Sequence, residues 1–184
     1  GLGELFVIRV AGNVIDDHQL GSIEYAAGHL GSPVVVVLGH THCGAVDAAI
    51  NSDPEGYIKF ITDEIKLAIG DETDDYKACC LNVKRSVELI EHSLDIQQIE
   101  EQEGLRVVGA MYHIEDGRIR LPFSALGGCG GVAAEQLAAA RDDGEGKYLS
   151  VEDLRRRASV SKTVIEALEA AGALEDIPKT TQIS

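Results

Sequence analysis

The sequence contains no long apolar run and no leader-like beginning. None of its hydrophobic stretches approaches the roughly 20 residues that a transmembrane helix requires, and no charged segment is followed by an apolar one as in a secretory signal. We therefore expect a cytoplasmic protein that does not enter membranes. Apolar residues still make up 45% of the 184 positions, which is enough for a folded core and argues against global disorder.

Cysteine is also scarce. The four cysteines are Cys43, Cys79, Cys80 and Cys129. Two of them are adjacent, which makes a simple disulfide framework awkward, so we expect free thiols in a reducing compartment.

Basic side chains are outnumbered by acidic ones, 16 to 31, and the net charge is −15. Residues 1–119 carry 8 basic and 21 acidic side chains, for a net charge of −13, and should repel nucleic acid. Residues 120–184 carry 8 basic and 10 acidic side chains, for a net charge of −2, and include the basic cluster Arg155–Arg157. This change in charge indicates a boundary near residue 120.

Hydrophobic periodicity up to about residue 119 predicts alternating strands and helices. The expected strands cover Leu5–Gly12, 32–39 and the two arms of a hairpin over 105–121, and the expected helices cover 19–30, 44–50, 53–69 and 77–103. The first strand is expected to be buried, and the second is an unbroken apolar run, which is typical of a strand buried on both faces of a parallel sheet. The pattern therefore predicts an α/β fold with a mostly parallel sheet flanked by helices.

Beyond residue 121 the strand signal disappears. The segment is rich in Gly and Ala and then gives two short helical patterns, for which Ser150 and Ser161 are suitable caps. We expect two domains, an α/β domain over 1–119 and a small all-helical tail over 122–184.

The candidate site lies in "VVLGHTHCGAV", where a strand gives way to a helix. His40 follows the strand, at the edge where open parallel sheets bind ligands, and Cys43 begins a helix, whose N-terminus favours a thiolate. An imidazole and a thiolate on one turn can bind a single tetrahedral Zn²⁺. The same spacing, taken alone, more often means an ordinary histidine and a buried cysteine. His42 is an alternative ligand, although we expect it to point away from His40.

Residues 1–119 resemble the β-class carbonic anhydrases. The resemblance rests on "ELFVIRVAGNVI", "GSIEYAAGHLGSPVVVVLGHTHCGAV", "CLNVKRSVELI" and "LRVVGAMYHIEDGRI", in the order of that family. It implies a zinc enzyme that reversibly hydrates CO₂ to bicarbonate and assembles as a homodimer or larger homo-oligomer, with His40 and Cys43 as zinc ligands. Relatives of this fold also hydrolyse carbonyl sulfide or carbon disulfide. His42, His18 or His29 could carry the proton released by the zinc-bound water to solvent, and the sequence selects none of them.

The sequence departs from that family at one point. The family's third zinc ligand is a Cys in a C-x-D-x-R loop shortly before the "LFVIRVAGN" strand, and the same loop carries an Asp–Arg pair beside the zinc-bound water. The motif occurs nowhere in this sequence and would precede Gly1. We therefore expect that an N-terminal segment is missing, that zinc binds weakly through two ligands, and that hydratase activity is impaired.

The tail carries a helix-hairpin-helix pattern, "ALGGCGGVAAEQL". In such a hairpin Gly128 and Gly130 would present backbone N–H groups to a DNA phosphate. Residues 120–184 resemble the C-terminus of the Gram-positive type of DNA polymerase III α subunit, which ends in a clamp-binding peptide. The resemblance implies weak contact with DNA or a sliding clamp. The alternative function is therefore that of a binding module joined to an inactive α/β domain. The sequence leaves open whether the two parts are joined in a natural protein.

Overall fold

The computed structural model describes residues 3–141 and 147–180. The chain divides into two compact units, Gly1–Leu121 and Pro122–Ser184. Each unit has its own cluster of buried apolar side chains. None of the helices in the described ranges is long and apolar enough to span a membrane.

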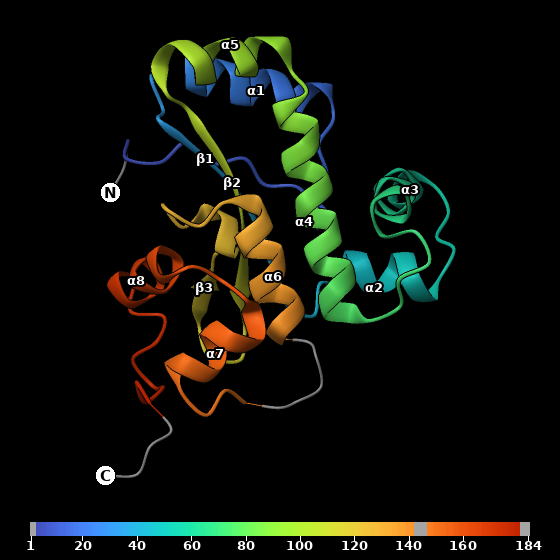
Figure 1. Cartoon of the computed structure of the whole chain (residues 1–184). Helices are drawn as coiled ribbons and strands as arrows, with labels where there is room; N and C mark the ends of the chain where they lie inside the picture. The colour runs from blue at the N-terminus through green and yellow to red at the C-terminus, as the bar shows by residue number, and fades with distance from the viewer. Residues whose placement is uncertain (1–2, 142–146, 181–184) are drawn as a thin grey trace. The chain divides into compact units, whose positions relative to one another are not determined.

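Three strands form the sheet of the first unit, in the order β1-β2-β3 (Figure 1). They are β1 (Val34–His40), β2 (Arg106–His113) and β3 (Arg118–Arg120). β1 and β2 are parallel, with His40 opposite Tyr112, whereas β2 and β3 form an antiparallel hairpin. The parallel pair and its flanking helices confirm the predicted α/β fold, and the hairpin confirms the turn predicted at Asp116-Gly117.

The prediction that β1 is buried on both faces is wrong. Val37 and Gly39 are buried, but the alternate side chains Val34, Val36 and Leu38 are 45–52% exposed. α4 (Asp75–Glu91) contacts β1, and its Val83 packs on the face that holds Gly39. The apolar run therefore produces only a half-buried strand in this chain.

The predicted strand over Leu5–Gly12 is also wrong. Leu5 and Val7 are 81% and 66% exposed, and residues 5–10 form no strand pairing among the described residues. A single turn of 3-10 helix, η1 (Ala11–Asn13), follows. β-Branched residues favour extended backbone, but a strand also needs hydrogen bonds from a neighbouring strand.

Five α-helices belong to this unit within the described residues. They are α1 (Asp17–Gly28), α2 (Gly44–Asn51), α3 (Tyr57–Ile69), α4 (Asp75–Glu91) and α5 (Leu94–Glu103). The single long helix predicted over 77–103 is wrong, because α4 ends at Glu91 and Ser93 caps the start of a separate helix, α5. The Ser93 hydroxyl accepts a hydrogen bond from the Ile96 N–H (3.3 Å) and donates one to Glu24 (2.6 Å). Gly104 ends α5 in a left-handed conformation, as predicted.

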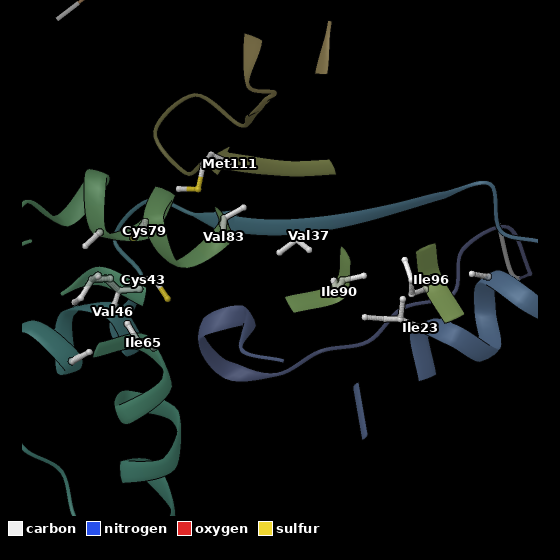
Figure 2. Close-up of a cluster of buried hydrophobic side chains, with 14 of the residues drawn as sticks. Ile23, Val37, Cys43, Val46, Ile65, Cys79, Val83, Ile90, Ile96 and Met111 are labelled. Carbon is white, nitrogen blue, oxygen red and sulfur yellow. The ribbon is translucent and has the colours of Figure 1, made fainter. Parts of the chain in front are cut away.

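Helix α4 makes a close approach to the sheet at two glycines. A Cβ on Gly39 would lie 3.0 Å from Sδ of Met111 and nearer still to Cγ2 of Val83, and a Cβ on Gly109 would lie 2.8 Å from Cγ1 of Val83. Val83 and Met111 belong to one buried cluster together with Cys43 and Cys79 (Figure 2). Only glycine leaves room at these positions for α4 to contact both parallel strands.

The described residues of the second unit form helices joined by turns and loops, with no strand among them. It contains η2 (Phe123–Ala125), α6 (Gly131–Arg141), α7 (Val151–Ala158) and α8 (Lys162–Ala170). The predicted caps are confirmed, because the Ser150 hydroxyl accepts from the Asp153 N–H (3.1 Å) and the Ser161 hydroxyl from the Val164 N–H (3.3 Å). Buried Leu137, Leu154 and Leu168 belong to the core cluster of this unit.

We predict that Gly39→Ala destabilises the protein by about 1–3 kcal/mol, because the new methyl group overpacks the contact with Val83. Gly21→Ala in α1 is the matched control, since nothing lies within 4 Å of its Cβ position. It should stabilise the helix by about 0.5–1 kcal/mol. Urea denaturation followed by circular dichroism gives both free energies, and equal values for the two variants would contradict the close approach.

Candidate metal site at the end of β1

The structure places His40 and Cys43 on either side of a tight turn. His40 is the last residue of β1, and Cys43 is the N-cap of α2 with extended backbone (φ −71°, ψ 114°). The Cys43 carbonyl accepts the first hydrogen bond of α2, from the Asp47 N–H (2.9 Å). The predicted change from strand to helix at this motif is therefore confirmed. Cys43 is buried and His40 is half-buried.

The His40 ring is oriented by a backbone carbonyl. Its Nδ1 lies 2.9 Å from the carbonyl oxygen of Thr41. Because a carbonyl oxygen can only accept, this contact requires a proton on Nδ1, and in the neutral ring Nε2 then carries the lone pair. Histidines that bind metals are commonly held in this way, with the other ring nitrogen donating to a backbone carbonyl. The donor set of His40 therefore fits a zinc ligand.

Cys79 of α4 lies against the backbone of Cys43. Burial raises the pKa of the Cys79 thiol to about 11, and a hydrogen bond with the Cys43 backbone opposes part of that increase. Cys79 is 2% exposed and Cys80 is half-buried. Cys79 is therefore a neutral, buried thiol at pH 7.

His42 has an unusual backbone conformation and two carboxylate neighbours. Its φ of +55° is in the left-handed region. Its Nε2 lies 2.8 Å from Oε1 of Glu115 and its Nδ1 lies 3.3 Å from Oδ2 of Asp75. Its backbone N–H also donates to Asp75 (3.3 Å). His42 is thus engaged by side chains from two other elements, and its side chain is 70% exposed.

Glu115 also bonds the residue before His42. Its Oε2 accepts from the Thr41 hydroxyl (3.1 Å), and that hydroxyl accepts from the Ile114 N–H (3.1 Å). Hydrogen bonding to its own backbone, to Thr41 and to His42 holds the pKa of the Glu115 carboxyl below its ordinary value. Glu115 is therefore ionised at neutral pH.

The other candidate residues lie elsewhere in the first unit. His18 is in the first turn of α1, 3.6 Å from Asp16, and His29 follows the end of α1, where its ring contacts Tyr25. Across residues 3–141 and 147–180, no three His, Cys, Asp or Glu side chains are grouped so that they could hold a metal ion.

The predicted phosphate contact of the tail is at the start of α6. Gly128 has a φ of +87°, and the Gly130 carbonyl accepts from the Ala134 N–H (2.9 Å) as the helix begins. The nearby basic cluster is partly neutralised within the unit. Arg156 lies 2.8 Å from Asp153, and the guanidinium of Arg157 stacks over the ring of Tyr148 at 4.5 Å.

The sequence analysis did not find Asp75 and Glu115. One signal was present for Asp75, because Asp75, Cys79 and Val83 recur every four residues and therefore share one face of α4. These three residues meet His42, Cys43 and Gly39 in turn. No local pattern connects Glu115 with a turn 73 residues earlier in the chain.

Comparison with known proteins gives a different family for each part of the chain. The carbonic anhydrase family profile matches residues 1–119, and a helix-hairpin-helix motif profile matches residues 92–182. A 63-residue match, 48% identical and covering 34% of this chain, is to DNA polymerase III PolC-type of Caldanaerobacter subterraneus, of which it covers 4%. Matches to PolC-type polymerases lie in the C-terminal region.

The carbonic anhydrase relatives agree in sequence and in structure. Carbonic anhydrase of Mycolicibacterium smegmatis is 38% identical over 144 residues, which is 72% of this chain and 69% of that protein. A tetrameric β-carbonic anhydrase from Sordaria macrospora superposes with a TM-score of 0.61 at 25% identity, covering 66% of this chain and 69% of that one. The chain spans about two thirds of the length of the carbonic anhydrases that it matches. The strand, turn and helix of the candidate site lie within residues 1–119, the part that matches the family profile. The chain belongs to the β-class carbonic anhydrase family.

Proposed function

We propose that the first unit catalyses the zinc-dependent, reversible hydration of CO₂ to bicarbonate, with Nε2 of His40 and Sγ of Cys43 as zinc ligands. The observation that supports this assignment is the Nδ1–H of His40 bonded to the Thr41 carbonyl at 2.9 Å, which leaves Nε2 available three residues before a buried cysteine. When bound, zinc would lower the pKa of a water ligand toward 7 and so provide hydroxide at neutral pH.

The chain's own residues would hold the ligands and limit the access of water. The Thr41 carbonyl fixes the His40 ring, and the N-cap position fixes the backbone of Cys43 at the start of α2. Cys43 is 5% exposed, so its sulfur would bind zinc in surroundings of low polarity. A thiol that coordinates zinc loses its proton, so this site would bind zinc more weakly as the pH falls.

We also propose that this chain is an impaired enzyme. Catalytic zinc takes three protein ligands and keeps one open position, and His40 and Cys43 supply two. The C-x-D-x-R motif that would add a third ligand and an Asp–Arg pair is absent from the sequence. Two ligands should bind zinc weakly and should leave the metal-bound water without its usual polar neighbours.

Exposed apolar side chains support a homo-oligomer. Leu5 and Val7, the β1 side chain Val36, and Tyr57 and Phe60 of α3 are all 52–90% exposed. Large apolar surfaces exposed on one chain are typical of protein interfaces. The relative from Sordaria macrospora is tetrameric. We therefore propose that these residues of the first unit contact other copies of the chain.

The first prediction for the site concerns zinc affinity. His40→Ala and Cys43→Ser should each weaken zinc binding by at least about 10-fold, because each removes one of two ligands. Competition with a chromophoric chelator measures the affinity, and Co²⁺ substitution should give a thiolate-to-metal absorption band that Cys43→Ser abolishes. His29→Ala and Cys80→Ala are matched controls that remove an imidazole and a thiol elsewhere. Equal affinity in all four variants would contradict the assignment.

The second prediction concerns turnover. Stopped-flow CO₂ hydration by this chain with added zinc should give kcat well below about 10³ s⁻¹, which is within the ordinary range for enzymes. A protein-free zinc solution and His40→Ala give the background rate. A value at or above about 10³ s⁻¹ would show that other residues replace the missing ligand and the Asp–Arg pair.

We propose a second function for the tail, as a module that weakly binds DNA phosphate or a sliding clamp. The match to a helix-hairpin-helix profile and the start of α6 after Gly130 support this proposal. The partly neutralised arginine cluster and the acidic first unit both favour low affinity.

For the tail we predict that Gly130→Asp reduces retention on immobilised duplex DNA at low salt. An aspartate at this position caps α6 favourably, so the fold is kept while the carboxylate repels phosphate. Gly127→Asp makes the same charge change, and nothing lies within 4 Å of either Cβ position. An equal loss in both variants, or no retention of the parent chain, would overturn a phosphate site at α6.

A further inference from the structure

We propose that Asp75 and Glu115 form a clamp on His42 that positions the two zinc ligands, so that all three are positioning residues. This inference rests on the zinc site proposed above. His42 lies between His40 and Cys43, and its backbone is left-handed with a φ of +55°. A residue other than glycine seldom adopts this conformation unless its surroundings hold it there.

Glu115 holds the turn from the side of the sheet. One of its carboxylate oxygens lies 2.8 Å from Nε2 of His42, and the other accepts from the Thr41 hydroxyl at 3.1 Å. The Thr41 N–H donates to the Tyr112 carbonyl (3.0 Å), which continues the pairing of β1 and β2 past the end of β1. The hairpin that follows β2 therefore fixes the first half of the turn.

Asp75 holds the turn from the side of α4. Its Oδ2 accepts from the backbone N–H of His42 at 3.3 Å and lies 3.3 Å from Nδ1 of the same ring. One helical turn further along α4, Cys79 bonds with the Cys43 backbone. Helix α4 therefore fixes the second half of the turn.

The consequence concerns the direction of the ligands. The backbone torsions of Thr41 and His42 set the direction of the Cys43 side chain relative to the His40 ring. The backbone N–H of Thr41 donates to β2 and that of His42 donates to Asp75 of α4, and the Cys43 backbone interacts with the Cys79 thiol of α4. The carboxylates of Asp75 and Glu115 engage the His42 ring from two sides and hold it in place.

Solvent exposure separates this role from a general contribution to stability. The side chains of His42 and Glu115 are 70% and 53% exposed, and exposed ion pairs contribute little to global stability. Loss of Glu115 should therefore change the geometry of the turn and the metal affinity while the thermal midpoint stays nearly constant.

The test compares Glu115→Ala, Glu115→Gln and the control Glu101→Ala, which removes one exposed carboxylate from α5. In the metal-free full chain, amide hydrogen exchange at Thr41, His42 and Cys43 should be about 10-fold faster in Glu115→Ala than in Glu101→Ala. Zinc affinity should fall by about 10-fold or more, as is typical when a residue that orients the metal ligands is removed. Glu115→Gln keeps an acceptor oxygen, so its amide exchange rates and its zinc affinity should both stay close to those of the unmodified chain.

The outcomes separate the clamp from the zinc site. Exchange rates and zinc affinities that are equal in Glu115→Ala and Glu101→Ala would overturn the clamp. Absence of zinc binding in the unmodified chain would overturn the zinc site, and the exchange rates alone would then decide whether the turn is clamped. Faster exchange with unchanged zinc affinity would show that the clamp has no positioning role and would also overturn the proposal.

Discussion

The contact between Val83 and two glycines is the constraint on which the rest of the first unit depends. Gly39 of β1 and Gly109 of β2 leave no room for a side chain, so α4 lies directly on the parallel pair. Because α4 is held this close to the sheet, the positions of its other residues relative to the end of β1 are fixed as well. Cys79 and Asp75, one and two turns before Val83, reach the backbone of Cys43 and His42.

The same helix fixes the N-terminal turn through polar contacts. Asn82 donates to the Gly12 carbonyl at 2.6 Å, and the Ser86 hydroxyl donates to the Asn13 carbonyl at 2.7 Å. Asn82 and Ser86 are each 2% exposed, so these hydrogen bonds satisfy groups that would be costly to bury alone. Helix α4 thus joins the N-terminal turn and the turn that bears the candidate ligands.

The two family matches overlap on residues 92–119, which the structure assigns to the first unit. That stretch supplies α5, β2 and most of β3, and β2 is the parallel partner of the strand that ends in His40. The position of His40 at the candidate metal site therefore depends on the pairing of β1 with this segment. The helical tail has a separate buried cluster, so its phosphate-binding and clamp-binding hypotheses can be tested without reference to zinc.

The sequence alone determined features that depend on nearby residues. These are the strand, turn and helix around His40 and Cys43, the serine caps of α7 and α8, the glycine that ends α5, and the hairpin turn. Such signals act over a few residues, which is why they could be read from the sequence without knowledge of the fold.

Only the tertiary structure decided features that need a distant partner. Residues 5–10 have the composition of a strand but lack paired neighbours in the described chain, and the exposed face of β1 is as apolar as its buried face. Asp75 and Glu115 come 33 and 73 residues after His42 and meet it only because α4 and the hairpin pack around the end of β1. Local periodicity carries no information about which distant carboxylate will reach a given turn.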